Sequence, residues 1–320
     1  MNVPTGGEVM GRTVRFGVTL PQIKRSWQQA ADAATEFDRL GFDSVWVCDH
    51  LYGVPMPTLP ILEGWTELAA VAAITGKVGL GTLVTPPFFR NPAVLAKQIA
   101  TIDQISGGRA IAGLGAGWFE AEFKAYGCEF PSVRERLRAL EESVQIMKAM
   151  WTEETVTFEG KHASVENVYC EPKPVRTPPI LIGGAGEKVL MGIVARHADI
   201  WNNMAATQGQ LPEKIEAMKR RCDQEGRDFD TLEVSQQCVV ILGADDAAAQ
   251  ANLEKAGKIY GGHMGGDLEK VGIWGTPAGV VDRIGRYVDM GCTNFVMEFF
   301  GKDTREPARL FAEKVLPAFR

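Results

Sequence analysis

An acidic residue and a histidine stand next to each other in the segment SVWVCDH, directly after a short apolar run. Asp49 and His50 follow Ser44–Cys48, which has the β-branched and aromatic composition of a strand. A carboxylate and an imidazole at the exit of a strand favour general acid–base chemistry, with His50 moving the proton. A helix cap or a salt-bridged loop pair is the structural alternative for the same two residues.

Three other apolar runs end in segments that could hold a ligand. The run GTLVTPPFFRNP has a double proline and aromatic residues, which predict either a wall beside a planar ligand or an ordinary rim loop. In GLGAGW, over 113–118, alternate glycines either open the backbone to a flat group or relieve crowding. In GGAG, over 183–186, the free N–H groups of a strand-to-helix turn suit a phosphate, with a plain tight turn as the alternative.

Composition excludes several classes of protein. The 320 residues include 34 Lys and Arg against 40 Asp and Glu, and the resulting net charge of −6 argues against binding to nucleic acid or to a membrane surface. No apolar stretch approaches the roughly 18 residues of a membrane span, and the first residues lack the apolar core of a signal peptide. The six cysteines form no C-x-x-C pair and the four histidines no H-x-x-x-H pair. We therefore expect reduced thiols, a cytoplasmic location and no metal site.

The elements that must position these residues alternate regularly between strands and helices. The predicted strands are 15–20, 44–48, 78–84, 110–114, 179–182, 198–202, 232–242 and 293–299. The predicted helices are 26–40, 65–75, 92–105, 133–151, 187–196, 212–225, 245–256, 277–290 and 305–319. Eight such units favour a closed (β/α)8 TIM barrel over an open sheet, since no G-x-G-x-x-G follows the first strand. We predict one α/β barrel domain with insertions over 14–320, after a flexible N-terminal extension over 1–13.

Two segments interrupt the alternation. Residues 155–169 contain two alternating runs around Glu159-Gly160, which predicts a β-hairpin inserted into the barrel. Residues 257–275 hold seven glycines, too many for a well-packed helix, and we expect either a surface loop or a lid over the active site.

Most of the chain, from about Val14 to Phe319, matches a known superfamily in an ordered series of segments. These are GFDSVWVCDH, EGWTELAAVAAIT, VGLGTLVTPPFFRNP, TIDQISGGRAIAGLGAGW, ERLRALEES, PPILIGGAGEK, HADIWNN and GTPAGVVDRIGRYVDMGC. The series resembles the luciferase-like monooxygenase superfamily, in particular its actinobacterial oxidoreductases that use the deazaflavin coenzyme F420.

The resemblance implies a cofactor site at four strand exits. Asp49 and His50 would contact the central ring system, with His50 as the catalytic acid–base residue. Thr82–Val84 would form a bulge that backs the ring, often through a non-proline cis peptide bond, and Ala116–Gly117 would contact the ring or the ribityl chain. The turn over 183–186 would bind the phosphate. The implied cofactor-binding residues are Asp49, His50, Thr82, Leu83, Val84, Ala116, Gly117, Gly183, Gly184, Ala185 and Gly186.

The chain departs from part of that family at Trp118. Members that oxidise glucose 6-phosphate carry a glutamate at this position, so the resemblance argues against sugar-phosphate oxidation by that route. The indole instead predicts that Trp118 contacts an apolar or flat substrate, with further substrate contacts from the loops over 51–64 and 257–275.

The resemblance also implies a mechanism. A hydride would pass between C5 of F420 and an electron-poor C=C, C=N or carbonyl group, while His50 moves the compensating proton. Two alternatives stay open: a two-component monooxygenase that uses reduced flavin mononucleotide (FMN), and a flavin-binding barrel without turnover. The resemblance favours a homodimer.

Overall fold

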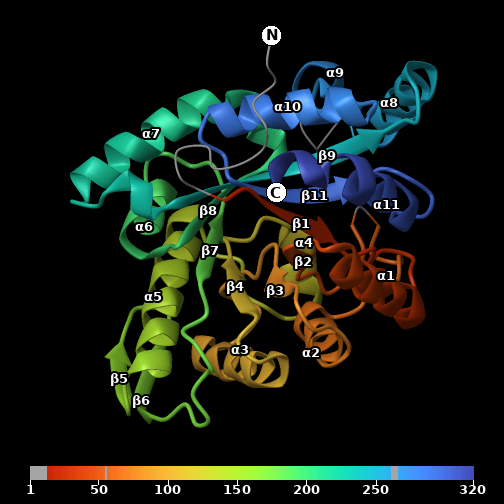
Figure 1. Ribbon diagram of the computed structural model, residues 1–320. Coiled ribbons are helices and arrows are strands. Elements are labelled where there is room, and N and C mark those ends of the chain that lie inside the picture. Colours follow the sequence, from red (N-terminus) through yellow and green to blue (C-terminus); the bar gives the residue numbers. More distant parts are fainter. Residues whose placement is uncertain (1–12, 55, 261–265) are drawn as a thin grey trace.

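The eight apolar runs expected as strands all form β-strands. They are β1 (Arg15–Thr19), β2 (Ser44–Val47), β3 (Gly79–Thr82), β4 (Ala110–Leu114), β7 (Ile180–Gly183), β8 (Ile200–Asn203), β9 (Glu233–Leu242) and β11 (Asn294–Phe299). They pair in parallel in this order, and the pairing of β11 with β1 closes the sheet (Figure 1). The computed structural model describes residues 13–54, 56–260 and 266–320. The predicted (β/α)8 TIM barrel is confirmed.

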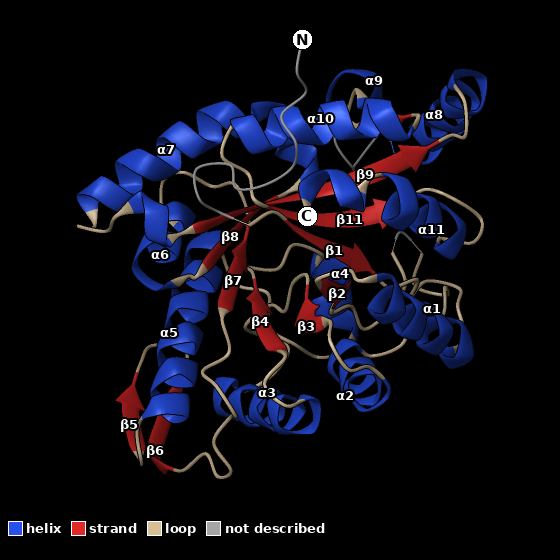
Figure 2. Cartoon of the chain, viewed as in Figure 1, coloured by secondary structure: helices blue, strands red, loops and turns tan. Residues whose placement is uncertain are grey.

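Helices surround the barrel in the predicted alternation (Figure 2). They are α1 (Trp27–Leu40), α2 (Gly64–Ile74), α3 (Pro92–Ser106), α5 (Val133–Thr152), α6 (Leu190–His197), α7 (Leu211–Gln224), α8 (Asp246–Tyr260), α10 (Pro277–Asp289) and α11 (Arg305–Lys314). Short helices add α4 (Glu120–Ala125), α9 (Leu268–Val271) and three 3₁₀ turns over Ala205–Gln210, Phe229–Thr231 and Leu316–Phe319. None of the described helices is long and apolar enough to cross a membrane.

Local signals in the sequence set the ends of several helices, as α1 illustrates. The Ser26 hydroxyl accepts a hydrogen bond from the Gln29 amide, and the Gln29 side chain accepts one from the Ser26 amide. At the other end Gly41 takes a left-handed conformation with φ of 84°, which a residue with a side chain adopts only at a cost. These local rules fix where α1 starts and stops before it packs on the barrel.

The barrel interior is filled by side chains. Trp46 on β2 lies inside, where its indole N–H donates to Ser44 Oγ at 2.8 Å. A Cβ on Gly17 would lie 2.3 Å from the Trp46 indole nitrogen, and a Cβ on Gly81 would lie 2.4 Å from its six-membered ring. Glycine on both neighbouring strands therefore makes room for this one large residue, and the centre of the barrel is a packed core.

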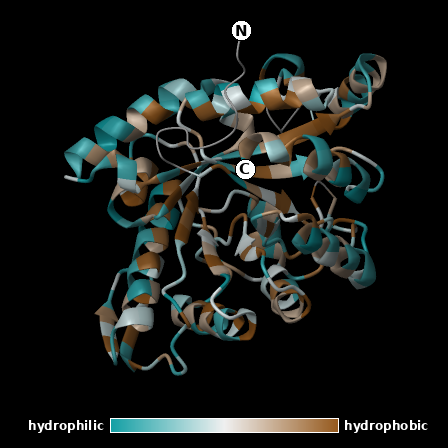
Figure 3. Cartoon of the chain, viewed as in Figure 1, coloured by the Kyte–Doolittle hydropathy of each residue, from teal (hydrophilic) through white to brown (hydrophobic). Residues whose placement is uncertain are grey.

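A second apolar layer lies between the strands and the helices, where strands are mostly hydrophobic and outer helix surfaces mostly hydrophilic (Figure 3). Near the chain ends this layer is aromatic. Its buried rings in contact are Phe16, Phe37, Phe42, Phe295, Phe299 and Phe311. Because α1 and α11 contribute Phe37 and Phe311, the layer ties the first helix to the last.

The predicted hairpin is confirmed and lies beside α5 (Figure 1). Its strands β5 (Val156–Glu159) and β6 (Ser164–Val168) pair antiparallel. The carboxylate of Glu142, on α5, accepts hydrogen bonds from the amides of Lys161, His162 and Ala163 at the tip. The hairpin is thus anchored to the barrel wall at its turn.

Three expectations from the sequence need correction. The segment over 257–275 is not an irregular loop throughout: α8 continues to Tyr260, α9 follows, and β10 (Ile273–Gly275) pairs with β9. The last predicted helix ends at Lys314 and continues as a 3₁₀ turn, because Pro317 has no amide N–H to donate. The helix expected from 187 begins at Leu190. Residues 261–265 and the extension expected over 1–13, apart from residue 13, lie outside the described residues.

Candidate active site

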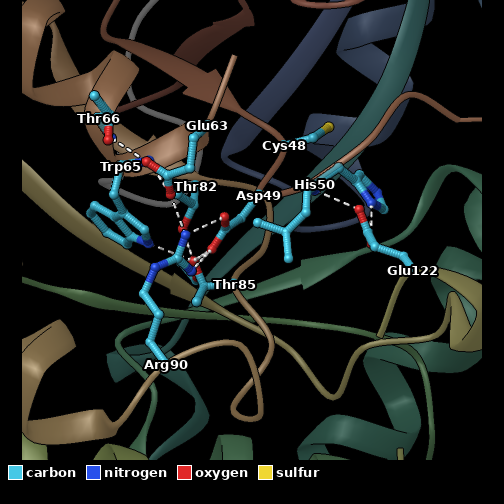
Figure 4. Close-up of polar contacts among 12 residues, drawn as sticks. Cys48, Asp49, His50, Glu63, Trp65, Thr66, Thr82, Thr85, Arg90 and Glu122 are labelled. Carbon is cyan, nitrogen blue, oxygen red and sulfur yellow. Dashed lines mark hydrogen bonds and ion pairs between the residues drawn. The ribbon is translucent and has the colours of Figure 1, made fainter. Parts of the chain in front are cut away.

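The candidate residues lie where β2, β3, β4 and β7 end, at the carboxyl-terminal rim of the barrel. In TIM barrels this rim carries the active site. The adjacent Asp49 and His50 do not form a pair there. Asp49 faces Arg90, whereas His50 faces Glu122 on the other side of the chain (Figure 4).

Asp49 is buried in an ion pair. Its side chain is fully buried, and both of its oxygens accept hydrogen bonds from the Arg90 guanidinium, at 2.5 and 2.9 Å. The Thr85 hydroxyl also donates to Asp49, at 2.8 Å. Among the alternatives left open by the sequence, these contacts match the salt-bridged loop pair, and contact between Asp49 and a cofactor stays a prediction.

Arg90, in the loop after β3, joins the exit of β2 to the N-terminus of α2. Besides Asp49 it contacts the carboxylate of Glu63, which also caps the N-terminus of α2 through the Trp65 and Thr66 amides. Burial alone would lower the pKa of Arg90, but the hydrogen bonds and charges of Asp49 and Glu63 outweigh burial and leave that pKa raised. The guanidinium therefore stays charged and locks the loop after β3 against the exit of β2.

His50 pairs with a residue on α4. Its Nδ1 lies 2.9 Å from Oε2 of Glu122, whose side chain is 1% exposed. The other oxygen of Glu122 accepts from the amides of Leu51 and Tyr52, at 2.5 and 3.1 Å. His50 Nε2 has no protein partner in the described part of the chain, so this atom is available to a ligand.

The exit of β3 forms the bulge that the resemblance implies. The peptide bond between Leu83 and Val84 is cis, and both side chains are only partly buried. The Thr82 side chain is fully buried and its hydroxyl donates to the Gly113 carbonyl at 2.7 Å, so this hydroxyl has no exposed surface with which to contact a cofactor. Within the bulge, Leu83 and Val84 are therefore the residues with partly exposed side chains that a cofactor could contact.

Two glycines at the end of β4, one inside the strand and one directly after it, make room for this bulge. A Cβ on Gly113 would lie 1.7 Å from the Thr82 carbonyl oxygen, and a Cβ on Gly115 would lie 2.4 Å from a Val84 methyl group. Relief of crowding, the alternative weighed from the sequence, therefore accounts for Gly113 and Gly115. The Val84 side chain consequently lies flush against the ends of β4 and β7.

Beyond these glycines the chain turns outward into an aromatic cluster. Gly117 takes a φ of 75°, and Trp118 beside it is 65% exposed. The indole stacks on Phe119 with ring centroids 5.1 Å apart and meets the His50 ring edge-on at 6.1 Å. Tyr52 packs edge-on against Phe119 at 5.6 Å. The cluster thus offers an apolar surface next to His50.

The glycine-rich turn after β7 contains backbone N–H groups that could donate hydrogen bonds to an anion. The Gly184 amide is used, since it donates to the Asn202 carbonyl at 3.0 Å. The structure gives the amides of Ala185 and Gly186 no acceptor within the described chain, and no side chain caps α6 at Val189. This end of α6 therefore suits an anionic group, although α6 begins four residues beyond Gly186.

Other features of the described residues do not build a second site at this rim. Glu67, behind the exit of β2, has a buried carboxylate oxygen without a partner, and burial raises its pKa to about 7 despite the hydrogen bond from Gln22. No group of three or more His, Cys, Asp or Glu side chains among the described residues could hold a metal ion. A cavity of about 830 Å³ opens at the opposite end of the barrel, where strands begin with Arg15, Ser44 and Asn294.

Arg90, Glu63 and Glu122 are contributors that the sequence did not reveal. Each reaches its partner across a long stretch of chain, and α4, which carries Glu122, was not predicted. The only available signal for α4 was the amphipathic run EAEFKA after Trp118.

Comparisons with known proteins show the family of this chain and support its fold. A model of the luciferase-like monooxygenase family matches residues 12–294. The F420-dependent glucose-6-phosphate dehydrogenase of Intrasporangium calvum is 28% identical over 92% of this chain and 95% of its own. An F420-dependent secondary alcohol dehydrogenase in complex with an F420-acetone adduct superposes with a TM-score of 0.84 at 24% identity, covering 97% and 100%. The FMN-bound oxygenating constituent of 3,6-diketocamphane monooxygenase from Pseudomonas putida superposes with a TM-score of 0.78 at 18% identity, covering 97% and 99%. The two solved structures support the fold.

Proposed function

From the premise that this chain belongs to the luciferase-like monooxygenase family, we propose that it is an F420-dependent oxidoreductase that moves a hydride to or from a small organic substrate. The observation that carries the choice of cofactor is the similarity to F420-dependent glucose-6-phosphate dehydrogenases over nearly the full length of both chains. The rim of the barrel supplies the chemistry that such a reaction needs from the protein.

The residues at the rim fit a planar cofactor with an anionic tail. The bare amides of Ala185 and Gly186 would hold a phosphate group. Lys188 adds a positive charge next to the turn, whereas the charge of Lys214 is compensated by its ion pair with Glu187. The partly exposed Leu83 and Val84 would lie against one face of the ring.

A bound deazaflavin would supply the hydride donor or acceptor, and the protein must then manage the companion proton. His50 would hold or take that proton at Nε2, the ring atom without a protein partner. Trp118 and Phe119 would shield the site from water and place the substrate next to the imidazole. The protein therefore contributes orientation, proton transfer and exclusion of water.

The aromatic cluster favours a flat or apolar substrate over a sugar phosphate. By the resemblance, Trp118 stands where the family members that oxidise glucose 6-phosphate carry a glutamate, and tryptophan has no charge to replace it. A small ketone, imine or conjugated alkene, or the corresponding alcohol or amine, would match the indole surface and the proton on His50.

A cofactor titration tests the proposal. Purified protein should quench the fluorescence of F420 at low micromolar concentrations and leave FMN fluorescence unchanged. Reduced F420 should then be reoxidised by members of a panel of small ketones, imines and conjugated alkenes. Binding of FMN without binding of F420 would overturn the proposal in favour of a two-component monooxygenase, and binding of F420 without turnover would leave a flavin-binding protein.

Placing a carboxylate in the turn over 183–186, where we propose that the phosphate binds, should weaken cofactor binding. We expect Gly186→Asp to raise the dissociation constant for F420 at least about tenfold, or about 1.4 kcal/mol, because the new carboxylate competes for the bare amides and repels the anionic tail. Gly186→Ala is the matched control, since its Cβ would meet only Leu190, at an ordinary 3.6 Å. Equal affinities of the two variants would remove the turn from the binding site.

A further inference from the structure

We infer that Glu122 is a positioning residue for His50: it selects the tautomer of the neutral imidazole that carries its proton on Nδ1, so that the lone pair of Nε2 lies at the rim. The inference concerns the arrangement of the ring, and its meaning for catalysis rests on the proposed function. It does not depend on which flavin binds.

The contacts of Glu122 determine which of its oxygens meets the histidine. Oε1 accepts hydrogen bonds from the consecutive amides of Leu51 and Tyr52, directly after His50 in the chain. Oε2 is left to face Nδ1, at 2.9 Å. With 1% of its side chain exposed, Glu122 has no room to exchange these partners for water. The short helix α4 thus clamps both the ring of His50 and the backbone that follows it.

This arrangement selects one of the two tautomers of a neutral imidazole. A carboxylate accepts hydrogen bonds and donates none, so Nδ1 must carry the proton that points at Oε2. The lone pair of the neutral ring then lies on Nε2, which has no partner in the described part of the chain. A general base for a substrate hydroxyl or amine needs that lone pair.

Glutamine at position 122 should reverse the selection while keeping the shape. The amides of Leu51 and Tyr52 require an oxygen at the place of Oε1, so the amide nitrogen of the glutamine would face the ring. Nδ1 must then accept a hydrogen bond, and the proton of the neutral imidazole moves to Nε2. The variant Glu122→Gln therefore converts the free ring atom from an acceptor into a donor.

Nitrogen NMR of the ligand-free protein tests the tautomer directly. In protein labelled with ¹⁵N-histidine, in mildly alkaline buffer, His50 should show a pyrrole-type Nδ1 and a pyridine-type Nε2, and His50→Ala identifies its signals. In Glu122→Gln the two types should exchange. The control Glu120→Gln lies on the same helix in an exposed pair with Lys124 and should leave the signals unchanged.

The spectrum of the wild-type protein tests the assigned tautomer of His50 without any further variant at position 122. A pyridine-type Nδ1 in His50 would overturn it, and so would an unchanged tautomer in Glu122→Gln. Neither result depends on F420 binding or on turnover, so failure of this inference and failure of the proposed function are distinguishable.

Kinetics then show whether the tautomer matters for the reaction. In the direction in which Nε2 takes a proton, Glu122→Gln should slow single-turnover hydride transfer about 10²–10⁴-fold, since the same exchange in a Ser-His-Asp triad costs about 10⁴. The F420 dissociation constant should stay within about threefold, because Glu122 does not reach the rim surface. Full activity alongside an exchanged tautomer would overturn the catalytic meaning of the inference.

Discussion

Replacing His50 with alanine is expected to slow hydride transfer about 10²–10⁴-fold while the affinity for F420 changes by less than about tenfold. The variant removes the imidazole that directly follows β2, and with it the proton donor or acceptor that we propose at Nε2. A loss of this size corresponds to about 3–5 kcal/mol of transition-state stabilisation. It should fall on the chemical step, because under the proposed function the ring would touch the reacting atoms while the turn over 183–186 would hold the cofactor.

Single-turnover absorbance at 420 nm separates the two effects, with enzyme in excess over reduced F420 and a substrate from the panel of ketones, imines and conjugated alkenes. The control is His197→Ala, since His197 lies at the end of α6 and contacts Glu141 on the outside of the barrel. We expect the control to keep its rate. An unchanged rate in His50→Ala would remove the acid–base role from this residue, whatever cofactor binds.

The positions of the rim residues could be predicted because they follow from local signals. Each strand was marked by an apolar run, and the closed barrel follows from eight repeats of strand and helix. Once the barrel is given, residues directly after a strand must lie at one rim. His50, Val84 and Gly186 therefore lie at the same rim although they are far apart in the chain.

The side-chain partners could not be predicted, because they depend on long-range contacts. Asp49 and His50 are neighbours in sequence, but successive side chains of extended backbone point to opposite sides. Their actual partners lie 41 residues away for Asp49, in Arg90, and 72 residues away for His50, in Glu122. The sequence thus predicted that both residues lie at the rim, and it gave no means of assigning their partners.

The glycine-rich segment after β9 shows a different limit. Composition over 257–275 predicted an irregular segment, yet tertiary contacts impose regular structure on both of its flanks. Gly275 ends a strand that pairs with Leu242 of β9, and Gly257 lies in α8 with open space where a side chain would be. The intrinsic helix or strand propensity of a residue predicts its conformation poorly wherever a neighbouring strand or helix supplies hydrogen bonds and apolar contacts.

Replacing Arg90 with methionine is expected to lower the free energy of unfolding by about 3–5 kcal/mol. Methionine keeps most of the volume of the side chain but leaves the buried carboxylate of Asp49 with only the Thr85 hydroxyl to compensate it. Urea unfolding followed by circular dichroism measures the loss. The control is Arg309→Met, which breaks a pair with Glu36 at a half-exposed position and should cost less than about 1 kcal/mol.

A double-mutant cycle identifies the buried charge as the cause. Asp49→Asn removes that charge, so adding it to Arg90→Met should restore about 1–3 kcal/mol of the stability lost by the single variant. Glu63 should contribute little to the coupling, because 36% of its side chain is exposed and water can solvate it when Arg90 is absent. Strictly additive effects of Arg90→Met and Asp49→Asn would mean that Arg90 stabilises the rim by packing alone. The ion pair would then have no part in holding the exit of β3 against that of β2, and the orientation of the Leu83–Val84 bulge would have to be set by Thr82 and Thr85.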